Sequence, residues 1–145
     1  MMRIQVINGA NLNMLGIREP DIYGNLTLDQ INEKIARKGG ELDLNLDFFQ
    51  SNHEGDIIDK IHDCYGKKDG IVINPGAFTH YSIAIRDAIA AVGIPTVEVH
   101  LSDINNREDF RKISVIKSVC LKQLWGKGVN SYIEALEFLV NESKK

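Results

Sequence analysis

The sequence has no excess of basic residues and no long apolar segment. Lys and Arg number 17 against 20 Asp and Glu, so the formal net charge is −3, whereas a nucleic-acid-binding chain needs a basic surface. The longest apolar runs, such as AIAAVGIP, are far shorter than the roughly 20 residues of a membrane-spanning helix. We therefore expect no nucleic-acid partner and no membrane partner.

Cysteine is scarce as well. Cys64 and Cys120 lie far apart and lack CxxC spacing, a usage typical of free, buried thiols in a reducing compartment. The N-terminal segment MMRIQVINGAN continues directly into a strand pattern, without the apolar stretch and cleavage site of a signal peptide. We therefore expect a cytoplasmic protein.

Several motifs of ligand-binding enzymes are absent. The first apolar run is followed by neither a GxGxxG loop nor a Gly-Lys-Ser/Thr phosphate loop, the usual signs of nucleotide binding. No HExxH pair occurs, and no His/Cys cluster has the spacing of a zinc site. Ser102 lies two residues after His100, so on a strand the two side chains point the same way and do not form a nucleophile–base pair by themselves. These absences disfavour a nucleotide site, a zinc site and a hydrolase triad.

The sequence does contain a regular alternation of apolar runs and amphipathic patterns. Its 145 residues, 43% hydrophobic and 26% charged, suit one globular domain that spans residues 1–145. The second run alternates apolar and polar residues, which is typical of a half-exposed strand near a sheet edge. Five runs are predicted to be strands: 3–8, 42–51, 70–76, 95–102 and 118–126.

Helical patterns separate these strands. We predict that Thr27 and Thr79 cap the first and third helices, and that the Gly39-Gly40 pair ends the first. In the second helix the apolar positions, Tyr65 among them, are expected to face inward. The four predicted helices cover residues 26–40, 55–66, 79–93 and 131–145.

Strands that alternate with helices form parallel sheets with helices on both faces. We predict a doubly wound α/β fold of the flavodoxin type, with five parallel strands in the order 2-1-3-4-5. In such sheets ligands bind outside the carboxyl ends of the strands, near the point where the order reverses. The segments NGANLN, NPGAFTH and HLSD follow three of the strands, so we expect a pocket for a small polyol or acid that is lined by Asn11, Asn74, His80, His100 and Ser102.

Each candidate also fits an ordinary structural role. His80 could occupy the first turn of its helix, and His100 could be a hydrogen-bonded residue at a strand end. Arg107 and Arg111, four residues apart beside two acidic residues, could form a surface ion-pair cluster of little energetic weight. Tyr23, taken alone, could be a packing residue. Only their convergence at the strand ends favours a functional site.

Three blocks of the sequence resemble a known family. NGANLNMLGIREPDIYG, NPGAFTHYSIAIRDAI and VEVHLSDINNREDFRKIS are similar, in order and spacing, to the conserved blocks of the type II 3-dehydroquinate dehydratases. The resemblance implies a flavodoxin-like fold, no metal or organic cofactor, and a homododecamer built from trimers. It also implies a reaction, the reversible loss of water from 3-dehydroquinate to give 3-dehydroshikimate, as in the shikimate pathway or in quinate breakdown.

The resemblance assigns the catalytic roles. It implies that the segment 16–25 is a lid that carries Tyr23 as the general base. A free phenol has a pKa of about 10, and a nearby cation lowers it; Arg18 on the same segment is the natural cation, because its charge is permanent. Asn11 is implied to hold a water at the developing oxyanion, and His100 to protonate the departing hydroxyl.

The same resemblance assigns the substrate contacts. The backbone N–H groups of Leu101 and Ser102, with Asn74, are implied to bind the substrate carboxylate. His80 and Arg111 are implied to hold the ring hydroxyls.

Two further residues, Arg107 and Asp87, complete the implied site. Arg107 is implied to line the closed lid together with Arg18. Asp87 lies seven residues after His80, about two helical turns, so we expect both on one face of a helix. In the family an Asp at this position reaches the site of a neighbouring subunit.

The chain also departs from the family pattern. Asp103 replaces the usual Asn after Ser102, and a carboxylate there would weaken binding of an acid unless it points away. Asn106 replaces a small residue, and Lys122, Gln123 and Trp125 make the fifth strand less apolar than usual. The alternative function is a non-catalytic flavodoxin-like module that binds a small organic acid. A phosphate-responsive signalling domain is disfavoured, because NGANLN supplies no clustered acids.

Overall fold

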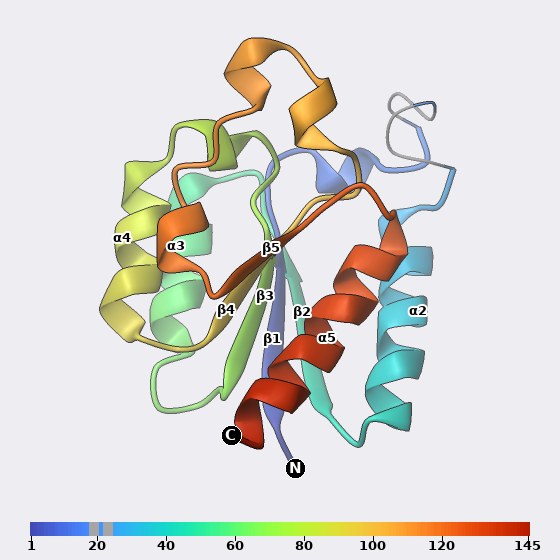
Figure 1. The fold of residues 1–145 in the computed structure, drawn as a ribbon, viewed down its shortest axis with the longest axis vertical. Helices are drawn as coiled ribbons and strands as arrows, with labels where there is room; N and C mark the ends of the chain where they lie inside the picture. The colour runs from blue at the N-terminus through green and yellow to red at the C-terminus, as the bar shows by residue number, and fades with distance from the viewer. Residues whose placement is uncertain (18–20, 22–24) are drawn as a thin grey trace.

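Five parallel strands form one sheet in the order β2-β1-β3-β4-β5 (Figure 1), as predicted. The computed structural model describes residues 1–17, 21 and 25–145. The second to fifth strands are shorter than predicted; the fifth keeps three residues of 118–126. The strands are β1 Arg3–Asn8, β2 Asn45–Gln50, β3 Gly70–Asn74, β4 Thr96–Val99 and β5 Lys122–Leu124.

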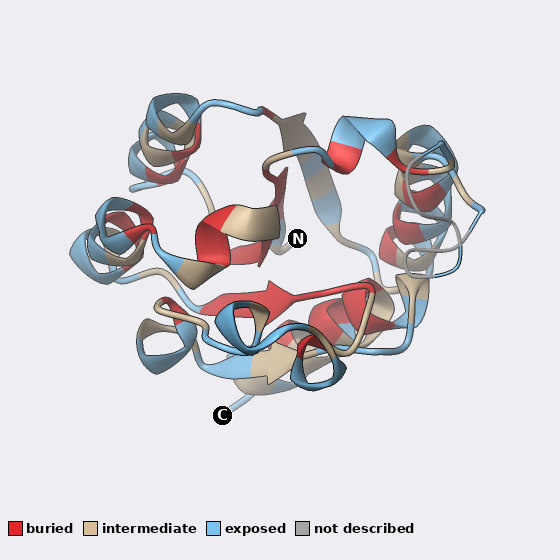
Figure 2. Cartoon of the chain, turned by 90° about the horizontal axis from the view of Figure 1, so that it is seen from above, coloured by how far each residue is buried: buried red, intermediate tan, exposed pale blue. Residues whose placement is uncertain are grey.

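Helices cover both faces of this sheet. Figure 1 shows α2 and α5 on one face and α3 and α4 on the other, and Figure 2 shows the same two layers from above. In the part of the chain that the structure describes, the α-helices are α2 Leu28–Glu41, α3 Glu54–Asp63, α4 Ile83–Val92 and α5 Val129–Ser143. None of them is long and apolar enough to cross a membrane.

The three central strands, β1, β3 and β4, are buried on both faces because their residues alternate between two cores. Ile4 and Val6 of β1 belong to the core under α2 and α5, whereas Ile7 belongs to the core under α3 and α4. β1 pairs with β3 so that Asn8 lies opposite Asn74. Both polar residues therefore reach the carboxyl edge of the sheet together, on the face that α5 covers.

The first helix begins as predicted and ends later than predicted. Thr27 caps α2 through a full capping box with Gln30. The predicted stop at Gly39-Gly40 is wrong, because α2 continues to Glu41. Gly39 faces β2, where an added Cβ would lie 2.5 Å from Leu46 Cδ1. The glycine therefore lets the helix approach the sheet and does not end it.

The third helix also begins later than predicted. The segment Gly76–His80 is a 3-10 turn, and Ser82 caps α4 by accepting a hydrogen bond from the Ile85 N–H. The predicted Thr79 cap is wrong because the Thr79 hydroxyl donates to buried Glu98. His80 lies outside α4, so the predicted shared helix face with Asp87 is wrong too.

The second helix ends before its last predicted apolar residue. α3 stops at Asp63, and Tyr65 is 71% exposed, so its predicted inward position is wrong. The buried position belongs to Cys64. Cys64 and Cys120 are both free, as predicted, but Cys120 is only partly buried. Burial raises the pKa of Cys64, and burial, helped by Glu98, raises the pKa of Cys120 to about 12.

Candidate functional site

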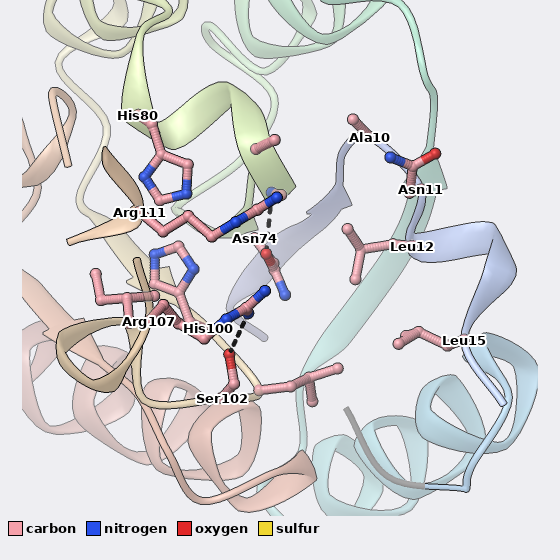
Figure 3. A pocket seen from close by; sticks show the side chains of 14 residues that line it. Ala10, Asn11, Leu12, Leu15, Asn74, His80, His100, Ser102, Arg107 and Arg111 are labelled. Atoms are coloured by element: carbon pink, nitrogen blue, oxygen red, sulfur yellow. Dashed lines mark hydrogen bonds between the residues drawn. The ribbon is translucent and has the colours of Figure 1, made fainter. Parts of the chain in front are cut away.

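An open pocket of about 530 Å³, including the solvent at its mouth, lies beyond the carboxyl ends of β1, β3 and β4. This is where the switch of strand order between β1 and β3 predicts a ligand site. Figure 3 shows side chains from three separate loops converging on it. The lining residues are Ala10, Asn11, Leu12, Leu15, Asn74, Gly76, Ala77, His80, His100, Leu101, Ser102, Ile104, Arg107 and Arg111.

The loops after β1 and β3 interlock through two glycines. The Gly9 N–H donates to the Asn74 carbonyl at 2.7 Å, and a Cβ on Gly9 would lie 2.2 Å from the Pro75 carbonyl oxygen. Gly76 has a φ of +63°, and its Cβ would lie 2.5 Å from the Ala10 carbonyl oxygen. Only glycine fits either position, so this contact fixes the two loops against each other.

Asn11 is held at the rim by side chains from the end of β2. Its backbone is left-handed, with a φ of 68°, and its N–H donates to Asn52 Oδ1 at 2.8 Å. The Gln50 amide donates to the same oxygen at 3.1 Å and to the Gly9 carbonyl at 3.2 Å. The amide side chain of Asn11 is exposed and stays available to a ligand.

His100 is anchored by a carboxylate that the sequence reasoning missed. Glu98, which is fully buried, accepts from His100 Nε2 at 2.5 Å and from the Thr79 hydroxyl at 2.7 Å. The Ser114 hydroxyl lies 2.8 Å from both carboxylate oxygens. A signal did exist in the sequence: a Glu in the otherwise apolar VEV run, two residues before His100 and so on its side of the strand.

The partners of Glu98 keep it ionised. Burial raises the pKa of this carboxyl group, but the hydrogen bonds and charge of His100, together with the Thr79 and Ser114 hydroxyls, bring the pKa below its ordinary value. A buried carboxylate therefore stands behind the imidazole. This arrangement fixes the orientation of the ring.

His80 reaches the pocket as a neutral acceptor. Its Nδ1 lies 2.7 Å from the Ile113 carbonyl oxygen, so Nδ1 carries the hydrogen and donates it. Burial lowers the pKa of His80, and the nearby His100 and Arg111 lower it further, against the opposing effect of the Ile113 carbonyl. Nε2 is therefore left with a lone pair that can accept from a ligand hydroxyl.

The remaining donors give the pocket an anion-binding character. Arg107 Nη1 lies 3.4 Å from the Ser102 hydroxyl, and Arg111 forms an ion pair with Glu108 at 2.6 Å while its guanidinium stacks on the Phe110 ring. Both arginines still line the pocket.

Two backbone donors complete this set. The N–H groups of Leu101 and Ser102 have no hydrogen-bond partner within residues 1–17, 21 and 25–145. Together with the two guanidiniums they can bind a carboxylate.

One predicted site residue, Asp87, is not brought to this pocket. Asp87 lies exposed on α4, where it pairs with Arg86 at 3.2 Å, and it is absent from the lining. Arg18 and Tyr23 lie outside the residues that the structure describes.

The two sequence departures near the pocket bind each other. Asp103 Oδ1 accepts from the Asn105 N–H at 2.9 Å, and Oδ2 accepts from the Asn106 side chain at 3.0 Å. Asp103 is therefore turned into its own loop, and it does not line the pocket. Its carboxylate does not oppose an acidic ligand directly.

No group of three or more His, Cys, Asp or Glu side chains is placed to hold a metal ion in the described ranges. The pocket offers instead an imidazole paired with a carboxylate, a neutral imidazole, amide groups and cations. The fold and this pocket define a flavodoxin-like α/β protein with a ligand site for a small, hydroxylated acid.

The chain belongs to the class II dehydroquinase family, whose model matches residues 2–140. It is 56% identical to a 3-dehydroquinate dehydratase from Halothermothrix orenii over 100% of this chain and 98% of that protein. It is 60% identical to a 3-dehydroquinate dehydratase from Caldicellulosiruptor saccharolyticus over 94% of each. The crystal structure of type II dehydroquinase from Butyrivibrio crossotus matches with a TM-score of 0.94 at 52% identity, covering 96% of this chain and 97% of that one.

Proposed function

We propose that residues 1–145 form one catalytic domain, and that its pocket carries out the reversible dehydration of 3-dehydroquinate to 3-dehydroshikimate. Membership in the class II dehydroquinase family and relatives named 3-dehydroquinate dehydratase support this function. The single structural observation that carries the proposal is the buried Glu98–His100 pair, which faces a set of anion-binding donors in one pocket. The protein then acts as a hydro-lyase in the shikimate pathway.

In this mechanism Tyr23 removes a proton from the carbon beside the ketone and leaves an enolate. Arg18 lowers the pKa of that phenol with a permanent positive charge. Asn11 holds a water that donates to the enolate oxygen, where negative charge appears. The roles of Tyr23 and Arg18 follow from the resemblance of segment 16–25 to the family.

His100 completes the elimination as the general acid. It donates a proton to the departing hydroxyl, so one water leaves and the new carbon–carbon double bond forms. Glu98 orients the His100 ring for this step through their hydrogen bond. The Glu98 carboxylate remains charged throughout, because His100, Thr79 and Ser114 favour its ionised form against the opposing effect of burial.

The rest of the pocket binds the substrate. The carboxylate meets the Leu101 and Ser102 N–H groups and the Asn74 side chain, and the ring hydroxyls meet His80 and Arg111. The neutral, acceptor form of His80 suits a hydroxyl donor. Arg107 closes the site from the side of the lid.

We extend the proposal to assembly and location. The exposed position of Asp87 on α4, away from its own pocket, suits a residue that reaches a neighbouring subunit, and a homododecamer built from trimers would supply that neighbour. Two free cysteines suit the cytoplasm.

The test is to incubate the purified protein with 3-dehydroquinate and to follow the ultraviolet absorbance of the conjugated product. We expect product to accumulate without added metal or cofactor. Ligand binding without product at any pH would overturn the proposal in favour of a non-catalytic module that binds a small organic acid.

A further inference from the structure

Three buried polar side chains, Tyr132, Asn8 and Asn74, form a hydrogen-bonded relay behind the pocket, on the face of the sheet that α5 covers. Tyr132 of α5 is fully buried, and Asn8 and Asn74 are 1% and 4% exposed. Asn74 Nδ2 lies 3.0 Å from the Tyr132 hydroxyl oxygen, and this hydroxyl lies 2.5 Å from Asn8 Oδ1. Of the three, only Asn74 lines the pocket.

One backbone N–H group determines the direction of both hydrogen bonds in this relay. The Gly76 N–H lies 3.1 Å from one side-chain atom of Asn74 (Figure 3, dashed line). A backbone N–H only donates, so this atom is the amide oxygen and the atom facing Tyr132 is the nitrogen. The phenol oxygen accepts from that nitrogen, so its single hydrogen goes to Asn8. Burial raises the pKa of Tyr132, so the phenol keeps this hydrogen.

These bonds leave the Asn74 side chain with one hydrogen-bond donor for a ligand. Its oxygen is occupied by Gly76, and one of its two amide hydrogens is occupied by Tyr132. The second amide hydrogen is the one donor that the Asn74 side chain still has for a ligand. Asn74 therefore faces the pocket as a donor, which suits a carboxylate, whereas a flipped amide would present an oxygen that repels it.

We propose that Tyr132, with Asn8 behind it, is a positioning residue that locks the Asn74 amide in its donor orientation toward the acidic group of the ligand. This inference rests on the proposed function for the identity of that ligand. A carboxylate contact of this kind is made in the ground state and the transition state alike, so losing it raises KM and leaves kcat nearly unchanged. A merely structural hydroxyl would affect the melting temperature and not KM.

The test compares Tyr132→Phe with a matched control on the same helix. Ser131 is fully buried beside Tyr132 in sequence, and its hydroxyl has no partner within the described part of the chain, so Ser131→Ala removes a buried hydroxyl without touching the relay. We expect Tyr132→Phe to raise KM for 3-dehydroquinate by about three- to tenfold, the weakening of one hydrogen bond to a charged group. Ser131→Ala should leave KM unchanged.

A double-mutant cycle then asks whether Tyr132 acts through Asn74. In an Asn74→Ala background the Tyr132→Phe substitution should no longer change KM. An unchanged KM in the single variant, or an equal rise in both backgrounds, overturns the proposal. If Tyr132→Phe does not fold, Asn8→Val removes the acceptor at the other end of the relay and should raise KM in the same direction; an unchanged KM there overturns it as well.

A second readout needs no turnover. In the nuclear magnetic resonance spectrum of the wild-type protein, the Asn74 side-chain hydrogen that faces Tyr132 should exchange slowly with water, and Tyr132→Phe should speed this exchange. An equal exchange rate in both proteins overturns the relay. Absence of turnover by the wild type, with this difference intact, would overturn the proposed function alone.

Discussion

Glu98 and His100 form a hydrogen bond of 2.5 Å between Oε2 and Nε2 at the end of β4. The two residues alternate with Val97 and Val99, which face the opposite core. Strand geometry therefore puts the carboxylate and the imidazole on the same side of the sheet. Thr79 and Ser114, from two other loops, fix the carboxylate from behind.

The first prediction concerns this pair. His100→Ala removes the proposed general acid, so kcat should fall by roughly a hundred- to ten-thousandfold. Glu98→Gln keeps the shape of the side chain and removes its charge, so it should also lower kcat, by a smaller factor. Steady-state kinetics with 3-dehydroquinate would measure both. A loss of less than about tenfold for His100→Ala would mean that His100 only positions the substrate.

Much of this site could be predicted because the ends of strands can be recognised in the sequence. A parallel sheet brings the carboxyl ends of its strands to one edge, so the sequence alone predicts that Asn11, Asn74, His80 and His100 lie together. The partners behind them were not predictable in the same way. Tyr132 bonds to Asn8 across 124 positions, a contact that depends on how α5 packs.

Local signals failed where a distant contact competes with them. Thr79 and Ser82 are both residue types that often cap helices. The Thr79 hydroxyl binds the buried Glu98 carboxylate instead, and Ser82 caps α4. The two glycines at 39 and 40 resemble a helix stop, but packing against Leu46 keeps Gly39 inside α2.

The second prediction concerns the interlocked loops. Gly9→Ala places a methyl group 2.2 Å from the Pro75 carbonyl oxygen, so it should lower the free energy of unfolding by about 2 kcal/mol or more. Gly40→Ala is the control, because a Cβ there meets nothing within 4 Å, and it should be neutral or stabilising by about 0.5 kcal/mol. Urea unfolding would compare them; equal stability of the two variants would refute a tight contact at Gly9.

The third prediction concerns Asp103. Its carboxylate is held by Asn105 and Asn106 within its own loop, so Asp103→Asn should change KM for 3-dehydroquinate by no more than about twofold, the weight of an exposed charge. Kinetics at low and high salt would measure this. A large fall in KM on substitution would show that the carboxylate does oppose the substrate.

The fourth prediction concerns Arg18 and Tyr23. If Arg18 lowers the pKa of the Tyr23 phenol, then Arg18→Gln should raise the basic pKa in the pH–rate profile. Activity at neutral pH should fall by a larger factor than activity at high pH, and Arg18→Lys should recover part of it. A profile that is only scaled down in the Gln variant would instead give Arg18 a role in lid order or substrate contact.

The fifth prediction concerns Ser114 and the pH dependence of stability. The Ser114 hydroxyl donates to Glu98 and helps to hold the pKa of that carboxyl group below its ordinary value of 4.5. A carboxyl group with a lowered pKa in the folded state stabilises the fold above the pKa of the unfolded chain. This stabilisation is lost as the pH falls through the folded-state pKa.

Ser114→Ala removes one of these donors, so it should lower the free energy of unfolding by about 1.5 kcal/mol at pH 7, as for a hydrogen bond to a charged group. The loss should shrink as the pH falls below 4.5, because protonated Glu98 depends less on the hydroxyl. Ser131→Ala, which removes a buried hydroxyl without a partner in the described ranges, should show a loss that does not vary with pH. Urea unfolding of the three proteins from neutral to acidic pH would separate these cases. A Ser114→Ala loss that stays constant with pH would mean that the hydroxyl stabilises the fold by packing and does not act on the charge of Glu98.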